Sequence, residues 1–327
     1  MAKITILCKA SFSQGMGHLV RQSHIAKTLR ERGHDIRFFI PDYLPAKAWL
    51  DQYGLLHQTL NEEKKVDGNL IILDIQNTTT AFIKKIKQDK NKVVSFEDLG
   101  EGRNHVDLLI DCNLDEEKSR RLPALFGHNY AVLAKEFEAY HSKVREFKEP
   151  MDSVLITFGG TDPHSMVPTL AKKILSIQPN ISITLLTGPG SKNISLLKDL
   201  ADKNNKVTLL ESTIKMAQTL FIHDAVFCAG GITLHEAMAV GTPAFVINQV
   251  THQVPKSQRA EEQGAAINLG MNDLWNENRL PEILKFNAKT LAKMSQAGKS
   301  LIDGKGLKRI ADAIEDLIRS GDNNTTS

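Results

Sequence analysis

The sequence predicts an α/β protein of two Rossmann-like, doubly wound domains that face each other across an interdomain cleft. Its 327 residues exceed one small core, because typical domains hold roughly 100–200 residues. Short apolar runs rich in β-branched residues alternate with helical patterns in two successive series. A charged stretch at about residues 135–150 carries no strand pattern and separates the series. We therefore expect domains at residues 1–148 and 149–320, followed by a disordered tail at 321–327.

Each series contains five predicted strands, most of them followed by room for a helix. The first five are Ile4–Leu7, Ile36–Ile40, Leu70–Leu73, Val93–Phe96 and Leu108–Ile110. The second five are Ser153–Phe158, Ile181–Leu186, Val207–Leu210, Ala225–Cys228 and Ala244–Ile247. Apolar strands separated by helices are typical of parallel sheets that are covered on both faces.

The chain after Leu269 has a wholly helical pattern. Its last part carries an apolar stripe at helical spacing, formed by Leu307, Ile310, Ala311, Ile314, Leu317 and Ile318. We expect this final helix to return to the first domain.

Composition and charge disfavour several classes of protein. The 41 basic and 38 acidic residues give a net charge of +3, and the lysines are scattered, so nucleic acid is not favoured as a partner. The three cysteines lie far apart in apolar runs, which indicates reduced core thiols rather than disulfides or a zinc site. No run approaches the ~18 apolar residues of a membrane span, so we expect a cytoplasmic protein without an integral membrane segment. The oligomeric state stays open.

The loop after the first strand holds the first candidate site. Gly15 and Gly17 free the backbone to approach a ligand, but a dinucleotide fingerprint would need a third glycine at Val20, which disfavours NAD. His18 would begin a helix, whose dipole disfavours the imidazolium and leaves a ring that can accept a proton. A packing role for His18 beneath the glycine turn is equally compatible with the sequence. Arg21, one turn on, suits either a phosphate or a surface carboxylate.

The strongest signal is a strand, glycine turn and helix around residues 225–237. Gly230 and Gly231 would direct backbone amides at phosphate oxygens, with the Thr233 hydroxyl as a further donor. Glu236, about one turn into the helix, could accept both hydroxyl protons of a ribose. The alternative for Glu236 is a carboxylate that complements the helix dipole.

Two further loops carry polar residues that suit a sugar nucleotide. Gly160 and Thr161 follow the first strand of the second series and would face the diphosphate or sugar from the opposite wall. Asn248, Gln249 and Gln253 follow the strand at 244–247, where they would reach sugar hydroxyls. Each of these residues alone is also compatible with ordinary loop polarity.

The adjacent pair His235-Glu236 does not form a metalloprotease motif. That motif needs a second histidine four residues after the first, and Ala239 stands there. We therefore expect neither a metal nor a cofactor.

Four blocks in this order resemble the UDP-sugar hydrolase of pseudaminic-acid biosynthesis and the related spore-coat polysaccharide biosynthesis proteins, which have the GT-B fold. The blocks are Gly15-Met16-Gly17-His18-x-x-Arg21, Phe96–Leu99, Asp107–Asn113 and Gly127–Phe137. The second half also resembles the peptidoglycan N-acetylglucosaminyltransferase. The chain departs from the hydrolases after Asp74, where Ile75-Gln76-Asn77 lacks their aromatic residue.

The resemblance implies a role for each block. Glu236 would hold the ribose of UDP, the loop near Met216 would contact the uracil, and the glycine turn at 230–231 would bind the diphosphate with Thr233. His18 would be the catalytic base.

Three activities fit these expectations. We favour hydrolysis of a UDP-N-acetylated sugar to UDP and free sugar with inversion, in the biosynthesis of surface polysaccharides or nonulosonic acids. An inverting glycosyltransferase would use the same base on an acceptor hydroxyl. The third is a sensor that only binds the nucleotide sugar. Such a protein has no turnover, and it would keep its UDP affinity when His18 is replaced by Ala.

Overall fold

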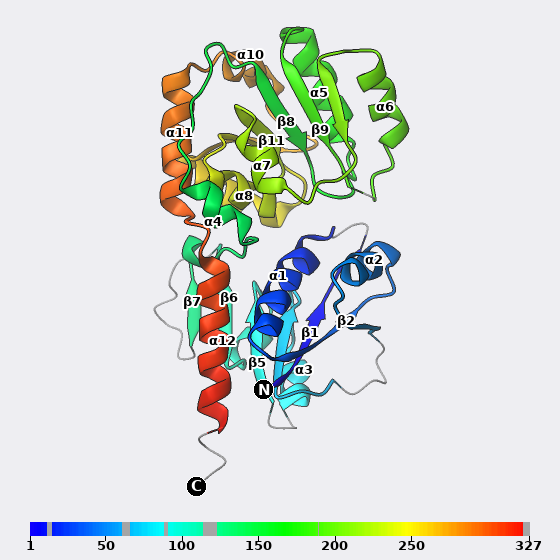
Figure 1. Ribbon diagram of the computed structural model, residues 1–327, viewed down its shortest axis with the longest axis vertical. Helices are drawn as coiled ribbons and strands as arrows, with labels where there is room; N and C mark the ends of the chain where they lie inside the picture. The colour runs from blue at the N-terminus through cyan, green and yellow to red at the C-terminus, as the bar shows by residue number, and fades with distance from the viewer. Residues whose placement is uncertain (12–14, 61–65, 88–90, 114–122, 189, 323–327) are drawn as a thin grey trace. The chain divides into compact units, whose positions relative to one another are not determined.

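The computed structural model describes residues 1–11, 15–60, 66–87, 91–113, 123–188 and 190–322. Within these ranges the chain forms two compact units (Figure 1). Unit 1 comprises Met1–Ala134 together with the chain from Lys305 onward, and unit 2 comprises Lys135–Gly304. Each unit is a parallel sheet with helices, as the sequence predicts.

Unit 1 is built on a seven-stranded sheet in the order β3-β2-β1-β4-β5-β6-β7, with all neighbours parallel. Its strands are β1 Lys3–Cys8, β2 Asp35–Ile40, β3 His57–Thr59, β4 Leu70–Asp74, β5 Lys92–Phe96, β6 Leu108–Asp111 and β7 Ala124–Phe126. Its helices are α1 Gly17–Glu31, α2 Leu44–Gln52, α3 Thr80–Lys87 and α12 Gly306–Asp322, with short 3-10 turns η1 Glu101–Asn104 and η2 His128–Tyr130.

Helix α12 belongs to unit 1 because its apolar stripe completes that unit's core. Ile310, Ala311 and Ile314 are fully buried together with α1 and the β1–β4–β5 side chains. Helix α12 begins at a glycine because a Cβ at Gly306 would collide with the carbonyl of Ala131. The expected return of the final helix to the first domain is thereby explained by burial of one helix face.

Unit 2 is built on a six-stranded parallel sheet in the order β10-β9-β8-β11-β12-β13. Its strands are β8 Ser153–Thr157, β9 Ser182–Leu186, β10 Val207–Leu210, β11 Ala225–Cys228, β12 Ala244–Asn248 and β13 Ala266–Met271. Its helices are α4 Glu136–His141, α5 Met166–Ile177, α6 Ile194–Asp202, α7 Met216–Phe221, α8 Ile232–Val240, α9 Val254–Glu262, α10 Leu280–Ile283 and α11 Ala288–Leu301, with 3-10 turns η3 Thr251–Gln253 and η4 Glu277–Arg279.

All ten predicted strands are present, and three further strands were not predicted. These three, β3, β7 and β13, lie at sheet edges, where a strand has one neighbour and needs no continuous apolar run. Strand β3 reads His57-Gln58-Thr59, and Asn268 and Gly270 interrupt the apolar pattern of β13. These segments therefore lack the continuous apolar run by which the other strands were predicted.

The observed unit boundaries differ from the predicted ones. The first unit ends at Ala134 rather than at residue 148, because α4 packs against α7 and α8 of the second unit. The predicted linker at 135–150 thus lies within unit 2. Helix α12 continues through Asp322, so the predicted disordered tail does not begin at Gly321, and residues 323–327 lie outside the described ranges.

Two further expectations concern cysteines and membrane spans. Cys8, Cys112 and Cys228 are buried free thiols, which confirms the expectation of core cysteines. In the described part of the chain, no helix is long and apolar enough to cross a membrane.

Truncation in α12 tests whether this helix stabilises unit 1. We expect Ile314→Ala to lower the free energy of unfolding by about 2–5 kcal/mol, because a fully buried side chain leaves a cavity. Urea unfolding followed by circular dichroism measures the change. The matched control is Asp316→Ala, whose side chain is 77% exposed on the same helix. Equal stability of the two variants would contradict the assignment of α12 to this core.

Candidate functional site

Strand order reverses at the first strand of each sheet. In unit 1, β1 lies between β2 and β4, and in unit 2, β8 lies between β9 and β11. Loops that leave the carboxyl ends of such neighbouring strands diverge, and ligands bind in the crevice between them. The predicted motifs follow these strands: the Gly15–Arg21 segment follows β1, and the two glycine turns follow β8 and β11.

The loop after β1 brings His18 to the end of β4. Gly15 adopts a φ of +77°, a conformation that favours glycine, and its amide donates to Ser11. Helix α1 begins two residues later at Gly17, which places His18 in its first turn. There Nδ1 of His18 lies 2.6 Å from Oδ1 of Asp74, the last residue of β4. The pair bridges the point at which strand order reverses.

Asp74 is the centre of a buried polar cluster. Its side chain is 0% exposed and accepts hydrogen bonds from Arg21 Nε at 2.6 Å, Arg21 Nη2 at 2.7 Å and Gln22 Nε2 at 2.8 Å. His18, Arg21 and Gln22 all come from the first two turns of α1. One carboxylate therefore fixes the start of this helix against the end of β4.

The charge of Asp74 determines the tautomer of His18. Burial alone raises the pKa of Asp74, but the charges and hydrogen bonds of Arg21 and His18 lower it to about 2. The carboxylate is therefore ionised at neutral pH and accepts the proton that Nδ1 carries. In the neutral ring, Nε2 then has a free lone pair, and the side chain is 26% exposed. This arrangement leaves Nε2 able to accept a proton.

Arg21 contacts two carboxylates in the interior. Its Nη1 lies 2.6 Å from Oε1 of Glu97, directly after β5, while its other nitrogens contact Asp74. The side chain is 7% exposed. Of the two roles considered for Arg21, phosphate contact or pairing with a surface carboxylate, the structure shows pairing, with the buried Asp74 and the half-buried Glu97.

Two more carboxylates follow β5 and β6. Asp98 ties the loop ends together, because it accepts hydrogen bonds from the amides of Thr78 at 3.0 Å and Gly100 at 2.9 Å. Asp111 ends β6, and burial together with the charge of Glu97 raises its pKa to about 6. Carboxylates therefore gather at the carboxyl ends of β4, β5 and β6 in unit 1.

The glycine turn after β11 combines one packed and one open glycine. A Cβ at Gly230 would collide with Oδ1 of Asn248 and lie 3.0 Å from Gln253, so only glycine fits. A Cβ at Gly231 would meet only Nε2 of Gln253, at 3.8 Å. Gly231 is the N-cap of α8, whose first amides have no partner within the helix. This open helix start is where an anion can bind.

Glu236 lies one turn into α8 beside a second carboxylate. Burial and the charge of Glu136 raise the pKa of Glu236 to about 7, against a hydrogen bond from Thr233 that lowers it. Glu136 begins α4, and its Oε1 accepts from the amide of Ala217 at 3.1 Å. Ala217 follows Met216 at the start of α7. The structure thus joins Glu236, Thr233 and the Met216 loop into one cluster.

The polar residues after β12 are less exposed than predicted. Asn248 is 0% exposed and donates to Asn268 at 3.0 Å and to the Gly270 carbonyl at 3.2 Å. Gln249 is 8% exposed, and its side-chain amide donates to the Ile247 carbonyl. Its backbone amide donates to Oε1 of Gln253 at 2.8 Å. The oxygens Asn248 Oδ1 and Gln249 Oε1 are buried without a partner among the described residues. Only Gln253 of this group is half-buried.

The turn after β8 lies next to the turn after β11, because the two strands pair with Thr157 opposite Cys228. A Cβ at Gly160 would meet no atom within 4 Å, so this glycine is open. Thr161 is 5% exposed. Among the described residues, no group of three His, Cys, Asp or Glu could hold a metal ion.

Comparison with known proteins agrees with this architecture. No family model matches the chain. The spore coat polysaccharide biosynthesis protein SpsG of Bacillus subtilis (strain 168) is 26% identical to it, over 96% of this chain and 98% of that protein. An uncharacterized protein of Methanocaldococcus jannaschii is 23% identical over 76% of this chain and 56% of its own length.

Solved structures show the fold of this chain. MurG of Acinetobacter baumannii has a TM-score of 0.68 at 11% identity and covers 97% of this chain and 100% of its own. The spinosyn rhamnosyltransferase SpnG has a TM-score of 0.64 at 15% identity, covering 99% and 100%. MnaA of S. aureus, solved with UDP, has a TM-score of 0.65 at 11% identity, covering 98% and 97%. The GT-B fold is therefore confirmed.

Sequence reasoning did not select the carboxylates that organise the candidate site. Asp74 was noted only as the acidic end of a strand, and Glu97 and Glu136 appeared only within blocks that resemble the hydrolases. One available signal was position: Asp74, Glu97 and Asp111 each end or directly follow a buried apolar strand. Parallel strands bring such residues to one edge of the sheet.

The depressed pKa of Asp74 predicts a pH dependence of stability. The folded value of about 2 lies below the ordinary 3.8, so the stabilisation is complete above about pH 4 and is lost as the pH falls to about 2. At about 1.4 kcal/mol per pKa unit, the loss amounts to about 2 kcal/mol. Urea unfolding between pH 2 and 6 should show the stability gap between wild type and Asp74→Asn narrowing toward pH 2.

Asp273→Asn changes an exposed carboxylate and serves as the control. The difference in unfolding free energy between this variant and wild type should not narrow toward pH 2. A gap for Asp74→Asn that is constant with pH would contradict the ionised, buried carboxylate.

Proposed function

We propose that this protein hydrolyses the bond between the anomeric carbon and UDP in a UDP-linked N-acetylated sugar, releasing UDP and free sugar. The observation that carries the proposal is the His18–Asp74 pair, with Nδ1 held at 2.6 Å and Nε2 left as a base. UDP is a good leaving group without protonation, so one base that activates water can suffice. The proposed place of the activity is the biosynthesis of surface polysaccharides.

The proposed reaction is a single displacement. A water oxygen attacks the anomeric carbon while Nε2 of His18 takes one of its protons. The anomeric C–O bond breaks, and its electron pair leaves with the diphosphate of UDP. Asp74 is buried and engaged by α1, so it orients His18 and does not form a covalent sugar intermediate. Inversion at the anomeric carbon follows from one displacement.

The proposed nucleotide site lies on unit 2. The open amides at Gly231 would bind the diphosphate, and the Glu236 carboxylate would accept the ribose hydroxyls. Support for a nucleoside diphosphate comes from GT-B proteins of similar structure that were solved with UDP or with dTDP. Gln253, which lies beside Gly231, would reach the sugar or the phosphates.

Glycosyl transfer is the second candidate, favoured by the similarity to MurG and the rhamnosyltransferase SpnG. In that reaction His18 would deprotonate an acceptor hydroxyl in place of water. The residues and the bond that breaks are the same, so only the nucleophile distinguishes the two reactions.

Replacement of His18 tests the base. We expect His18→Ala to lower UDP release from UDP-N-acetyl-sugars about 10²–10⁴-fold, because general base catalysis contributes that much, while UDP binding persists. UDP and free sugar are measured together in buffer alone. The control is His24→Gln, which changes a second histidine of α1, six residues after His18. UDP binding without turnover in wild type would favour a transferase, and full turnover in His18→Ala would refute the proposed base.

The raised pKa of Glu236 predicts that nucleotide binding depends on pH. The folded value of about 7 lies above the ordinary 4.5, so the carboxylate becomes fully ionised only above neutral pH. If the anion accepts the ribose hydroxyls, affinity for UDP-N-acetylglucosamine should weaken by up to about tenfold as the pH falls from 8 to 6. Isothermal titration calorimetry on wild type and Glu236→Gln measures this affinity at each pH. The diphosphate of UDP-N-acetylglucosamine does not titrate between pH 6 and 8, so a pH dependence reports on the protein.

In Glu236→Gln the pH dependence should flatten. The exposed Glu262→Gln, also in unit 2, should behave like wild type. An unchanged pH profile in Glu236→Gln would exclude Glu236 as the titrating contact.

A further inference from the structure

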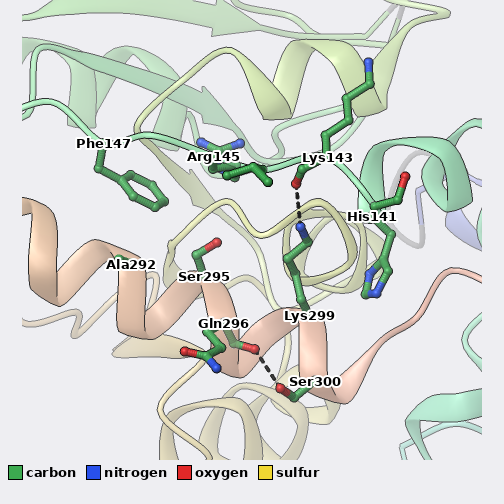
Figure 2. A pocket seen from close by; sticks show the side chains of 11 residues that line it. His141, Lys143, Arg145, Phe147, Ala292, Ser295, Gln296, Lys299 and Ser300 are labelled. Carbon is green, nitrogen blue, oxygen red and sulfur yellow. Dashed lines mark hydrogen bonds between the residues drawn. The ribbon is translucent and has the colours of Figure 1, made fainter.

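A basic cavity of about 570 Å³ lies within unit 2, between residues 141–147 and helix α11 (Figure 2). Four of its eleven lining residues are His141, Lys143, Arg145 and Lys299, and none is acidic. The Lys143 side chain extends away from the cavity in Figure 2, with its ammonium 3.6 Å from the Tyr140 ring centroid. The basic groups at the cavity are therefore the Arg145 guanidinium, the Lys299 ammonium and the His141 imidazole.

Lys299 contributes an ammonium with spare hydrogen-bond donors. Its Nζ donates to the carbonyl of Lys143 at 2.7 Å, across the cavity from α11 (Figure 2). An ammonium has three donors, and no carboxylate partner of Lys299 occurs among the described residues. Burial and the nearby charge of Arg145 lower the pKa of Lys299. The two cations thus repel each other without a bridging anion.

Arg145 is held rigidly at the cavity wall. Its Nη1 donates to the Phe221 carbonyl at 2.7 Å, and its Nη2 donates to the His223 carbonyl at 2.6 Å. Its Nε is buried with no hydrogen-bond partner in the described structure. Burial lowers the pKa of Arg145 to about 10 despite the charge of Asp224. Nη1 also donates to Thr242 Oγ1 at 3.0 Å, so the buried Nε is the donor of Arg145 that favours an anion nearby.

Ser295 adds a hydroxyl between these cations. Its side chain is 7% exposed, has no hydrogen-bond partner among the described residues and projects from α11 on the side of Arg145 (Figure 2). Gly241 makes room for this group, because a Cβ there would collide with Ser295 Oγ and lie 2.9 Å from Lys299 Cδ. The Ser295 hydroxyl therefore has free hydrogen-bonding capacity for a ligand or water.

The charge of helix α8 does not neutralise this cluster. The carboxyl end of α8 lies here, since Ala239 accepts from His141 Nδ1 at 3.0 Å and Gly241 caps the helix. A helix carboxyl end carries a partial charge of roughly −0.5, which is smaller than the charge of two cations. The charge of Asp224 acts on Arg145 and offsets part of its charge, so Lys299 is the cation of the pair without a carboxylate partner among the described residues.

We propose that this cavity is a binding site for a small phosphate-bearing anion, held by Lys299, Arg145 and the Ser295 hydroxyl beside the Phe147 ring. Phosphate oxygens suit such charge-assisted donors, and the volume admits an ester larger than inorganic phosphate. The site lies at the carboxyl end of α8, whereas the open glycine turn lies at its amino end. Nine helical residues, about 13 Å at 1.5 Å each, separate the two.

The experiment is isothermal titration of the full chain with inorganic phosphate, pyrophosphate and glucose 1-phosphate, alone and with excess UDP. We expect Lys299→Gln and Ser295→Ala to weaken binding, with Lys299→Gln losing about tenfold or more because a charge-assisted donor is removed. The control Lys293→Gln makes the same charge change on an exposed position of α11 and should bind like wild type. Circular dichroism melting confirms that each variant is folded.

The ligand series identifies the source of the phosphate group. Tighter binding of glucose 1-phosphate would indicate a phosphate ester, and tighter binding of the inorganic ions would indicate free phosphate or pyrophosphate. Binding that persists in excess UDP and depends on Lys299 supports the proposal. Equal affinities of wild type, Lys293→Gln and Lys299→Gln, or no binding of any of the three anions to wild type, would overturn it.

Discussion

The reversal of strand order at the first strand of each parallel sheet is the constraint on which both candidate sites depend. Chain segments that leave β1 and β4, or β8 and β11, must pass to opposite sides of their sheet. Polar groups at those strand ends are therefore not covered by the same helix layer. In unit 1 a buried carboxylate fills this place, and in unit 2 an open glycine turn does so.

The buried carboxylate of Asp74 links stability to chemistry. An isolated ionised carboxylate in the interior would be costly, but the Arg21 guanidinium and the Gln22 amide compensate it. The same contacts hold α1, so that His18 keeps one ring nitrogen directed at Asp74 and the other available. The proposed base is positioned by the interactions that close this end of the unit 1 core.

Charge is distributed differently along helix α8 of unit 2. Its amino end has open amides and the Glu236–Glu136 carboxylate pair, while its carboxyl end adjoins Lys299 and Arg145. Helix α4 has the same distribution of charge: it begins with Glu136 and ends with His141, which lines the basic cavity. An anion in that cavity would contact residues next to the carboxyl end of α8, the helix that carries the proposed Glu236 contact to the nucleotide.

The sequence by itself determined the two parallel sheets, since ten of their strands are continuous apolar runs, and it placed Gly15, His18, Gly231 and Glu236 at strand-to-helix turns. Local patterns suffice there because burial on both faces and turn chemistry are properties of neighbouring residues. Only the tertiary structure decided that Asp74 orients His18 across 56 residues, and that Asn248 is internal. Those outcomes depend on which strands pair, and strand pairing is a long-range property that short-range periodicity does not encode.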